Sequence, residues 1–379
     1  MADEVDDRIA CKYGLNCYSK NPEHLKKYKH VKERVVESES PPKKFKKADD
    51  GTDASTKDGS DEHMIIVTEL PVDVKEKIKL LFLVEMPDDF YDFYEFCKSI
   101  SKVSPRKALK PLNLELVGPF DVFDGSLKNC SKDAALRHYR YFYDPPEFQT
   151  LLKGEEKEQL HYGYFRDDPK EFPCFVAKNR AAVAPTITCV AGNLFGAVNV
   201  HADEVKAAAD IFRKMQIQKI QSALVKWAKK KNITLDTVTP AIKARRSKTV
   251  AKTFNSIGIV VPYDRKTDVG YRPLAVNDDE LKKILKKIVS ADNDTERDVA
   301  WSKLQPVITA ASIANDECDF GTSLELGIDL FAFGEEILHT TIEQVMCATY
   351  NLLQRNIFAE ILRAHLKSRK RDSNLSTIV

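Results

Sequence analysis

The sequence predicts an α+β protein, with a body of helices and antiparallel strands behind a small N-terminal module and a polar linker. Three observations lead to this fold class. Short strand patterns are confined to the middle of the chain, helical patterns stand on both sides of them, and strands do not alternate with helices as in a parallel sheet. Cysteine and histidine are also clustered near the N-terminus, ahead of a long polar stretch.

Length and composition exclude several classes of protein. The 379 residues are enough for one large domain or two ordinary ones with tails, and 43% apolar residues is ordinary for a globular chain. No run of about 18 apolar residues could span a bilayer, and the polar, acidic first residues do not form a signal peptide. The net charge is only +2 although 31% of the residues are charged, so the distribution of charge is more informative than its total.

The eight cysteines fall into two groups. Six of them lie in apparent core segments, where we expect reduced, buried thiols of an intracellular protein: Cys97, Cys130, Cys174, Cys189, Cys318 and Cys347. The other two belong to a metal-ligand pattern near the N-terminus.

That pattern is Cys11-x5-Cys17-x6-His24-x5-His30. Two thiolates and two imidazoles are a closed ligand set for tetrahedral Zn²⁺, which indicates a structural rather than a catalytic site. A segment this short has no core, so metal binding would have to supply its folding free energy. The alternative is a chance cluster that shares no metal. Six residues between the second cysteine and the first histidine are too few for the usual DNA-reading finger, which has about twelve.

Cations and aromatic rings surround these ligands. Residues 8–36 hold eight lysines and arginines against Glu23 and Glu33, and such cations can pair with phosphates while a ring stacks on an adenine. The stretch resembles the poly(ADP-ribose)-binding zinc finger at Arg8, Cys11, Tyr13, Gly14, Cys17, Tyr18, Asn21, His24 and His30. Ser19 stands where that family has a basic residue. The resemblance implies a structural zinc on Cys11, Cys17, His24 and His30, and an ADP-ribose site with Arg8, Tyr13 and Tyr18.

A charged, small-residue segment follows and cannot bury enough apolar surface to fold. Its PPKKFKK run at 41–47 is either a nuclear import signal or a solvated basic run. The domain boundaries that we predict are 1–34 for the finger, 35–63 for the disordered linker, 64–367 for the body and 368–379 for a disordered C-terminal tail. The tail begins within a second basic cluster, KSRKR at 367–371.

In the body, residues 76–100 are helical at both ends, with Pro87 as a start signal for the second helix. Strand patterns follow at 112–123, 139–152, 161–169, 173–179 and 186–200. A long helix is predicted over 201–233, a strand over 256–274, and helices from about 278 to 370.

A basic region spans residues 226–252, with nine lysines and arginines against Asp236 alone. One interpretation is a solvated helix face and loop. The other is contact with nucleic acid or with an acidic protein.

Three carboxylates stand together in ANDECDFGTSLELGIDLF, residues 314–331. Pro306 is a good first-turn residue, and the run after it predicts a helix that ends near Asn315. Asp316, Glu317 and Asp319 therefore follow a helix C-terminus, where the helix dipole disfavours acids.

Three explanations for these acids remain open. In the first, Asp319 caps the next helix. In the second, the acids bind a hard metal ion, but such a site would need more oxygen ligands than these three residues offer. In the third, Glu317 does proton chemistry as a general base in a partly apolar cleft beside Ala314, Cys318 and Phe320. Periodicity alone favours a structural turn.

Five segments in order are similar to the histone PARylation factor family, accessory subunits of DNA-break-activated poly(ADP-ribose) polymerases. They are FYDPPEFQT (142–150), YFRDDPKEFP (164–173), GIVVPYDRKTDVGYRPL (258–274), residues 314–331 and YNLLQRNIFAEILRAHL (350–366). The resemblance covers roughly residues 70–367.

This resemblance implies half of a joint active site. The chain would dock on the polymerase catalytic domain beside NAD⁺, which the partner binds and this chain alone does not. Glu317 would be the general base that takes the proton of an acceptor serine in histones. Asp316 would make a docking contact and Arg272 would shape the joint site, with Pro273 standing where the family usually has an acid.

We therefore expect a catalytic accessory factor that is not an enzyme alone. It would be a monomer without a membrane partner, located in the nucleus on chromatin at DNA breaks. Two other functions are a non-catalytic reader or scaffold for poly(ADP-ribose), and a free-standing hydrolase that uses Asp316 and Glu317 as an acid/base pair. Adjacent residues flank one bond poorly at the separation that glycosyl chemistry uses, so the hydrolase ranks last.

Overall fold

The computed structural model describes residues 9–10, 28–29, 73–372 and 375–377. The chain divides into two compact units, Met1–Glu62 and His63–Val379. In the first unit, β1 (Ile9–Ala10) pairs in parallel with β2 (Tyr28–Lys29). The predicted zinc ligands and the linker lie outside the described residues.

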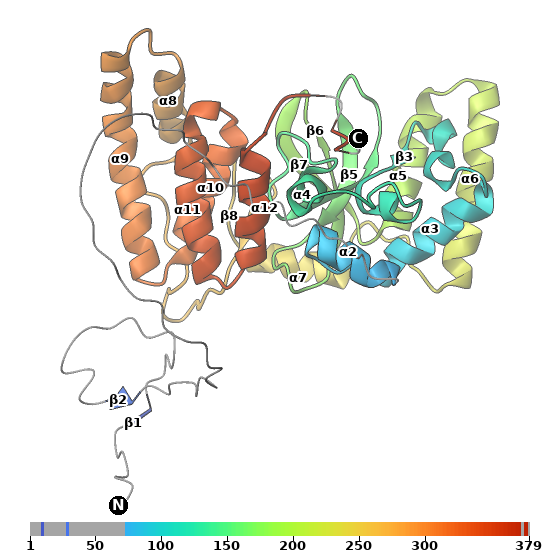
Figure 1. The fold of residues 1–379 in the computed structure, drawn as a ribbon, viewed down its shortest axis with the longest axis horizontal. Helices are drawn as coiled ribbons and strands as arrows, with labels where there is room; N and C mark the ends of the chain where they lie inside the picture. Colours follow the sequence, from blue (N-terminus) through green and yellow to red (C-terminus); the bar gives the residue numbers. More distant parts are fainter. Residues whose placement is uncertain (1–8, 11–27, 30–72, 373–374, 378–379) are drawn as a thin grey trace, which may run out of the picture. The chain divides into compact units, whose positions relative to one another are not determined.

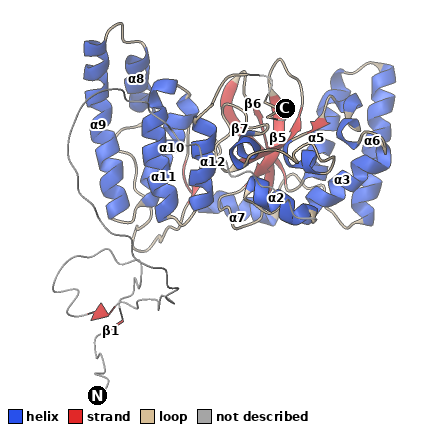
Figure 2. Cartoon of the chain, viewed as in Figure 1, coloured by secondary structure: helices blue, strands red, loops and turns tan. Residues whose placement is uncertain are grey.

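The second unit is built around an antiparallel sheet of order β3-β4-β5-β6-β7. Figure 2 shows this sheet between two groups of helices. Its strands are β3 (Glu115–Leu116), β4 (Phe148–Lys153), β5 (Leu160–Phe165), β6 (Phe175–Arg180) and β7 (Ala184–Ala191). The α+β prediction is confirmed, because this sheet and the helices belong to one compact unit.

One group of helices comes from residues 74–248, and part of it lies on one side of the sheet in Figure 1. It consists of α2 (Val74–Phe82), α3 (Asp88–Ile100), α4 (Lys132–Arg137), α5 (Leu194–Ala208), α6 (Ile211–Lys230) and α7 (Pro240–Lys248). Short 3₁₀ turns at Pro105–Lys107, Lys110–Leu112 and Gly118–Val122 connect this group to the sheet.

The second group is a bundle of C-terminal helices on the other side of the sheet (Figure 1). Its members are α8 (Asp278–Val289), α9 (Asp294–Asp316), α10 (Phe320–Phe333), α11 (His339–Leu352) and α12 (Asn356–Leu366), with a 3₁₀ turn at Glu336–Leu338. A small antiparallel pair, β8 (Thr249–Ala251) and β9 (Ile259–Val260), lies before the bundle in the sequence. Helix α10 is central, because it packs against both α9 and α11.

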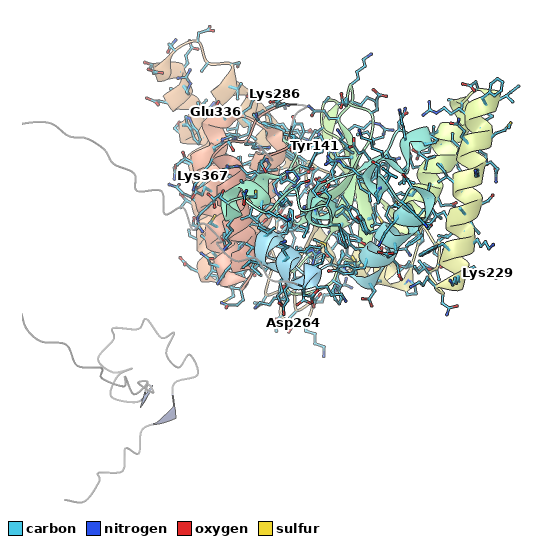
Figure 3. The ribbon with its side chains drawn as sticks, turned by 45° about the vertical axis from the view of Figure 1, so that its right-hand side comes forward. Tyr141, Lys229, Asp264, Lys286, Glu336 and Lys367 are labelled. Carbon is cyan, nitrogen blue, oxygen red and sulfur yellow. The ribbon has the colours of Figure 1, made fainter. Side chains whose placement is uncertain are left out.

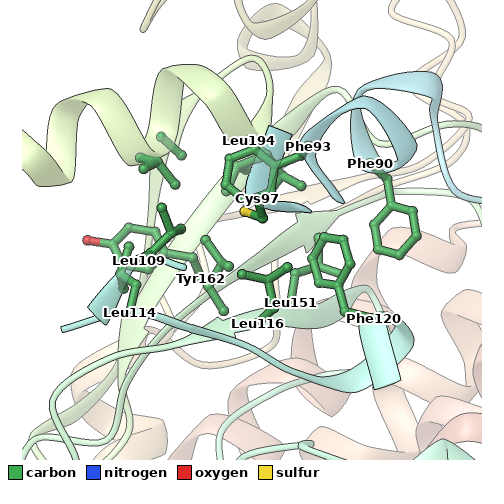
Figure 4. Close-up of a cluster of buried hydrophobic side chains, with 14 of the residues drawn as sticks. Phe90, Phe93, Cys97, Leu109, Leu114, Leu116, Phe120, Leu151, Tyr162 and Leu194 are labelled. Carbon is green, nitrogen blue, oxygen red and sulfur yellow. The ribbon is translucent and has the colours of Figure 1, made fainter. Parts of the chain in front are cut away.

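The largest core cluster joins α3 and α5 to the sheet. Figure 4 shows Phe90, Phe93 and Phe120 in this cluster together with Leu151 of β4 and Tyr162 of β5. The rings of Phe90 and Phe120 stack with centroids 4.2 Å apart. The phenylalanines of α3, Phe90, Phe93 and Phe96, are therefore core residues.

Several predicted elements differ from the structure. The strand expected over 112–123 is reduced to β3, because the chain turns into a 3₁₀ helix at Gly118. The helix expected over 201–233 is two helices, α5 and α6, and α5 begins inside the segment expected to be a strand. The strand expected over 256–274 is only β9 followed by a loop with one isolated bridge, Asp264 to Val269.

Pro306 does not begin a helix. It lies in the interior of α9, which starts at Asp294 with Asn293 as its N-cap. An interior proline lacks one backbone donor and costs about 3 kcal/mol. Burial of Leu304 and Val307 on either side of it offsets that cost.

The C-terminal segment packs against the body in its described part. Arg369 is 8% exposed, and the backbone N–H of Tyr139 donates to Leu375 O at 3.0 Å. Among the described residues, no helix is long and apolar enough to cross a bilayer.

Candidate functional site

Glu317 ends helix α9. Its backbone N–H donates to Ile313 O at 3.1 Å, and the next residue, Cys318, adopts a left-handed backbone with φ of 69°. The chain then reverses, and Asp319 N–H donates to Ala314 O at 2.7 Å. These bonds fix the backbone of Glu317 between two packed helices.

A second segment, residues 270–272, is hydrogen-bonded to the start of α10. Gly270 N–H donates to Asp319 Oδ1 at 2.8 Å, and Gly321 N–H donates to Gly270 O at 2.9 Å. The hydroxyl of Thr322 accepts from Arg272 N–H at 3.1 Å and donates to Arg272 O at 2.7 Å. We call these four bonds the 270–322 clip.

Gly270 is required by this geometry. Its φ is +120°, and a Cβ atom there would lie 2.1 Å from Pro262 O. No side chain fits so close to a backbone oxygen.

The clip brings Arg272 to Glu317. The guanidinium Nη1 forms an ion pair with Glu317 Oε2, and its Nε lies 3.6 Å from Asp319 Oδ2. The Glu317 side chain is 56% exposed and that of Asp319 is 11% exposed. Arg272 therefore joins one exposed and one buried carboxylate.

The partly apolar cleft expected around Glu317 is not present. Its carboxylate faces solvent beside Arg272, and Cys318 next to it is exposed rather than buried as expected. Asp319 stands at the N-cap position of α10 but makes no capping bond, because its carboxylate accepts from Gly270 instead.

Asp316 is exposed and makes no ion pair with any described residue. Ile313, which is 49% exposed, precedes Asp316 and Glu317 by three and four residues in α9. Residues at this spacing share one helix face. The structure thus brings Arg272 and Glu317 into contact, while Asp316 and Ile313 are exposed at the same end of α9.

Sequence reasoning missed Gly270 and Thr322, which hold this site in place, and it assigned Asp319 to a helix cap instead of to the bond with Gly270. The bonds from Gly270 to Asp319 and from Arg272 to Thr322 join residues 49 and 50 positions apart along the chain, so no local pattern links them.

Two buried acids lie further along α10. Burial raises the pKa of Glu325 to about 7, and the Tyr271 hydroxyl partly offsets this. Burial also raises the pKa of Asp329 to about 8, although Asp329 Oδ1 accepts from Phe254 N–H at 2.8 Å.

A groove of about 940 Å³ is lined in part by Tyr271, the residue before Arg272 in the sequence. It is lined by residues of α7, of β8 and β9, and of the segment 167–174. The basic region 226–252 contributes Arg245 and Lys248 to its wall. Arg245 is buried and makes a bidentate pair with Asp167 at 2.9 Å for both bonds, so it is not a free surface cation.

Comparisons with known proteins identify the family of this chain. A family model described as Histone PARylation factor 1 matches residues 73–369, and a model of the PBZ domain matches residues 8–33. The chain is 41% identical to Histone PARylation factor 1 of Danio rerio over 309 residues, which are 81% of this chain and 88% of that protein.

Two mammalian proteins give similar values. Identity to Histone PARylation factor 1 of Bos taurus is 40% over 309 residues, 80% of this chain and 89% of that protein. Identity to the putative histone PARylation factor 1-like protein of Homo sapiens is 35% over 306 residues, 79% of this chain and 88% of that protein. These matches confirm the resemblance, and the chain belongs to the Histone PARylation factor 1 family.

Proposed function

We propose that this chain is an accessory factor of a poly(ADP-ribose) polymerase and that it directs ADP-ribosylation to serine residues of histones, with Glu317 as general base. One observation carries the proposal. The backbone of Glu317 is fixed at the end of α9 while its carboxylate is exposed. A carboxylate presented in this way can enter the active site of another protein.

The chemistry explains why a polymerase would need this carboxylate. The carboxylate of a glutamate acceptor is ionised near pH 7, whereas a serine hydroxyl is a weak nucleophile until a base removes its proton. A positioned general base contributes about 10² to 10⁴ in rate. Glu317 beside the acceptor hydroxyl would therefore shift the modification from carboxylates to serine.

Arg272 and Asp316 have supporting roles in this proposal. Arg272 keeps the Glu317 carboxylate paired in the free chain and becomes part of the wall of the joint site. Asp316, exposed and without an ion-pair partner among the described residues, contacts the polymerase together with Ile313.

Glu317→Gln tests the proposal in a reaction of the full chain with a poly(ADP-ribose) polymerase, nicked DNA, NAD⁺ and a histone peptide. Hydroxylamine cleaves the ester of a modified glutamate but leaves a serine linkage intact, so it separates the two products. We expect the variant to bind the polymerase and to lose the hydroxylamine-resistant product. Glu336→Gln, at an exposed glutamate that Figure 3 labels, is the matched control.

Persistent serine modification by Glu317→Gln would refute the catalytic role. It would favour the alternative of a reader or scaffold, in which the chain only recruits other proteins to poly(ADP-ribose).

For the N-terminal segment we propose a structural zinc and binding of poly(ADP-ribose). The match to the PBZ domain over residues 8–33 supports this, as does the set of two thiols and two imidazoles at Cys11, Cys17, His24 and His30. Arg8, Tyr13 and Tyr18 would contact ADP-ribose. Replacing Cys17 with alanine should release one zinc per chain and abolish polymer binding by that segment. Retained zinc and polymer binding would contradict it.

Modification of histones together with poly(ADP-ribose) binding implies a location in the nucleus, at chromatin with DNA breaks. We propose that histones are both substrate and partner there, and that the chain acts as a monomer.

A further inference from the structure

A pocket of about 230 Å³ lies at the other end of the C-terminal bundle, between the ends of α4 and α12 and residues 375–377. Its lining includes Arg137, Arg140, His365, Ser368, Lys370 and Thr377. No carboxylate belongs to the described lining residues. The pocket is therefore cationic and rich in hydrogen-bond donors.

The C-terminal segment that closes the pocket is anchored to α4. Thr377 N–H donates to His138 Nδ1 at 3.1 Å, and the Thr377 hydroxyl donates to Ala134 O at 2.9 Å. His138 is itself held by Asp121 at 2.8 Å. This wall is consequently a fixed part of the fold.

Arg140 is a buried cation of the pocket, and it makes no direct ion pair with any residue that the structure describes. Its guanidinium donates to three backbone carbonyls, those of Leu136, Pro145 and Phe148, at 2.9 to 3.1 Å. Burial lowers the pKa of Arg140 to about 10, although Asp144 and Glu147 act against this through their charge. Both of these carboxylates are bonded elsewhere, Asp144 to His161 and Glu147 to Tyr350.

Arg369 is a second buried cation in the same neighbourhood. It lies 4.1 Å from the ring centroid of Phe142 and 3.8 Å from that of Phe331, and its Nη1 has no hydrogen-bond partner among the described residues. Burial lowers the pKa of Arg369 to about 9. Two buried guanidinium groups thus place positive charge in a low-dielectric region, and nearby carboxylates offset it only in part.

His365 faces this positive charge from the last turn of α12. It is 4% exposed, and its Nδ1 is buried without a hydrogen-bond partner in the described structure. Burial and then the charges of Arg369 and Arg140 lower the pKa of His365 well below its usual value. A buried polar atom without a partner is costly, and a water or a donor group of a bound molecule next to Nδ1 would relieve that cost.

We propose that this pocket binds a phosphoryl or pyrophosphoryl group. Arg137, half-buried and without an ion pair among the described residues, and Lys370 at the mouth would make charge-assisted bonds to its oxygens. The hydroxyls of Ser368 and Thr377 supply further polar groups. Lys370 also pairs with Asp372 at 2.9 Å and would share that contact. The volume accommodates a diphosphate but not a whole dinucleotide.

Two local factors oppose an anion. The C-terminal ends of α4 and α12 both approach the pocket, and their dipoles disfavour negative charge. The described lining nevertheless carries three basic side chains and no acid, so the electrostatic balance favours the oxyanion.

The test uses the full chain labelled with ¹⁵N-histidine and inorganic pyrophosphate as probe, at constant ionic strength kept with sodium chloride. We expect a saturable change in the ring signals of His365 and a rise in the midpoint of thermal unfolding. Arg137→Ala and Lys370→Ala should each weaken pyrophosphate binding about tenfold, as expected for loss of one charge-assisted bond. ADP-ribose in a parallel titration distinguishes a nucleotide diphosphate from free pyrophosphate as the tighter ligand.

Lys367→Ala is the matched control. Lys367, labelled in Figure 3, lies at the C-terminal end of α12, and its replacement removes one positive charge, as Lys370→Ala does. Its side chain pairs with Asp133 and does not line the pocket. Equal weakening by Lys367→Ala, or no saturable change at His365, would overturn the proposal. Arg137→Ala and Lys370→Ala each remove a side chain that reaches solvent. If one of these variants fails to fold, pyrophosphate binding by the other decides between the outcomes.

Discussion

Arg272 and Glu317 form an ion pair that joins the loop before α8 to the C-terminal end of α9. Both side chains are substantially exposed, 41% for Arg272 and 56% for Glu317, so the pair contributes little to stability. Its consequence is positional, because it holds the proposed base in one direction until a partner and an acceptor arrive.

Arg272→Ala should lower serine modification in the joint reaction about tenfold while changing the free energy of unfolding by less than about 1 kcal/mol. The variant loses the group that orients Glu317, but the base remains. Initial rates of hydroxylamine-resistant product, compared with a denaturation curve, measure the two effects separately. Arg272→Lys should recover part of the rate. An unchanged rate in Arg272→Ala would show that the ion pair has no role in the joint site.

Asp316→Ala should weaken binding to the polymerase without affecting the fold. The side chain is exposed and has no ion pair among the described residues, and substitutions at such sites usually change stability by less than about 0.5 kcal/mol. Titration of the Asp316→Ala chain, carrying a fluorescent label, with the polymerase catalytic domain gives the dissociation constant of the complex. Asp294→Asn, at an acid whose side chain is 93% exposed at the other end of α9, is the control. Equal affinity of Asp316→Ala and the control would exclude the docking role.

Thr322→Val tests the 270–322 clip. Valine keeps the shape of threonine but removes the hydroxyl that both accepts from and donates to the Arg272 backbone. Because Thr322 is only 3% exposed, the loss of these bonds should destabilise the protein by about 1–3 kcal/mol. Chemical denaturation measures this, with Thr340→Val at an exposed threonine as control. A clip that positions the site also predicts a lower rate of serine modification in the folded variant, and an unaltered rate would limit its role to stability.

Local patterns in the sequence predict much of the fold. Helix α8 is an example, because Leu281, Ile284, Leu285 and Ile288 repeat at helical spacing behind the Asn277 cap. The errors occur where tertiary structure overrides a local signal. Pro306 looks like a helix start but is tolerated inside α9 by the packing around it.

The candidate site is predictable only in part for the same reason. The acids around Cys318 are visible in the sequence, and the family resemblance selects Glu317 among them. The contact with Arg272 depends on a clip between segments about 50 residues apart, which has no periodic pattern. The prediction of a partly apolar cleft around Glu317 was wrong, because apolar residues next to it in the sequence do not determine which side of a helix end faces solvent.

Stability should fall as pH rises from about 5 to 8, and Asp329 should be a main cause. Burial raises its pKa to about 8 in the folded chain, against an ordinary value of 3.8. Between these values the folded chain holds a proton that the unfolded chain has lost. The stabilisation is therefore complete below pH 4 and disappears as pH rises through about 8, with a slope of up to about 1.4 kcal/mol per pH unit for this proton. Glu325, raised to about 7 by burial, adds a second contribution over the range up to its own pKa.

Asp329→Asn tests this assignment, because the amide oxygen can still accept from Phe254 N–H while the titration is removed. We expect a flatter dependence of the unfolding free energy on pH, measured by urea denaturation at several pH values between 5 and 8.5. Other groups close to Asp329 are Glu325, Asp278 and Lys282, so Glu325→Gln is measured alongside it. Asp294→Asn should keep the wild-type slope, since its carboxyl is exposed. If Asp329→Asn keeps that slope as well, the buried carboxyl of Asp329 does not hold the proton, and another group on the chain must account for any dependence that remains.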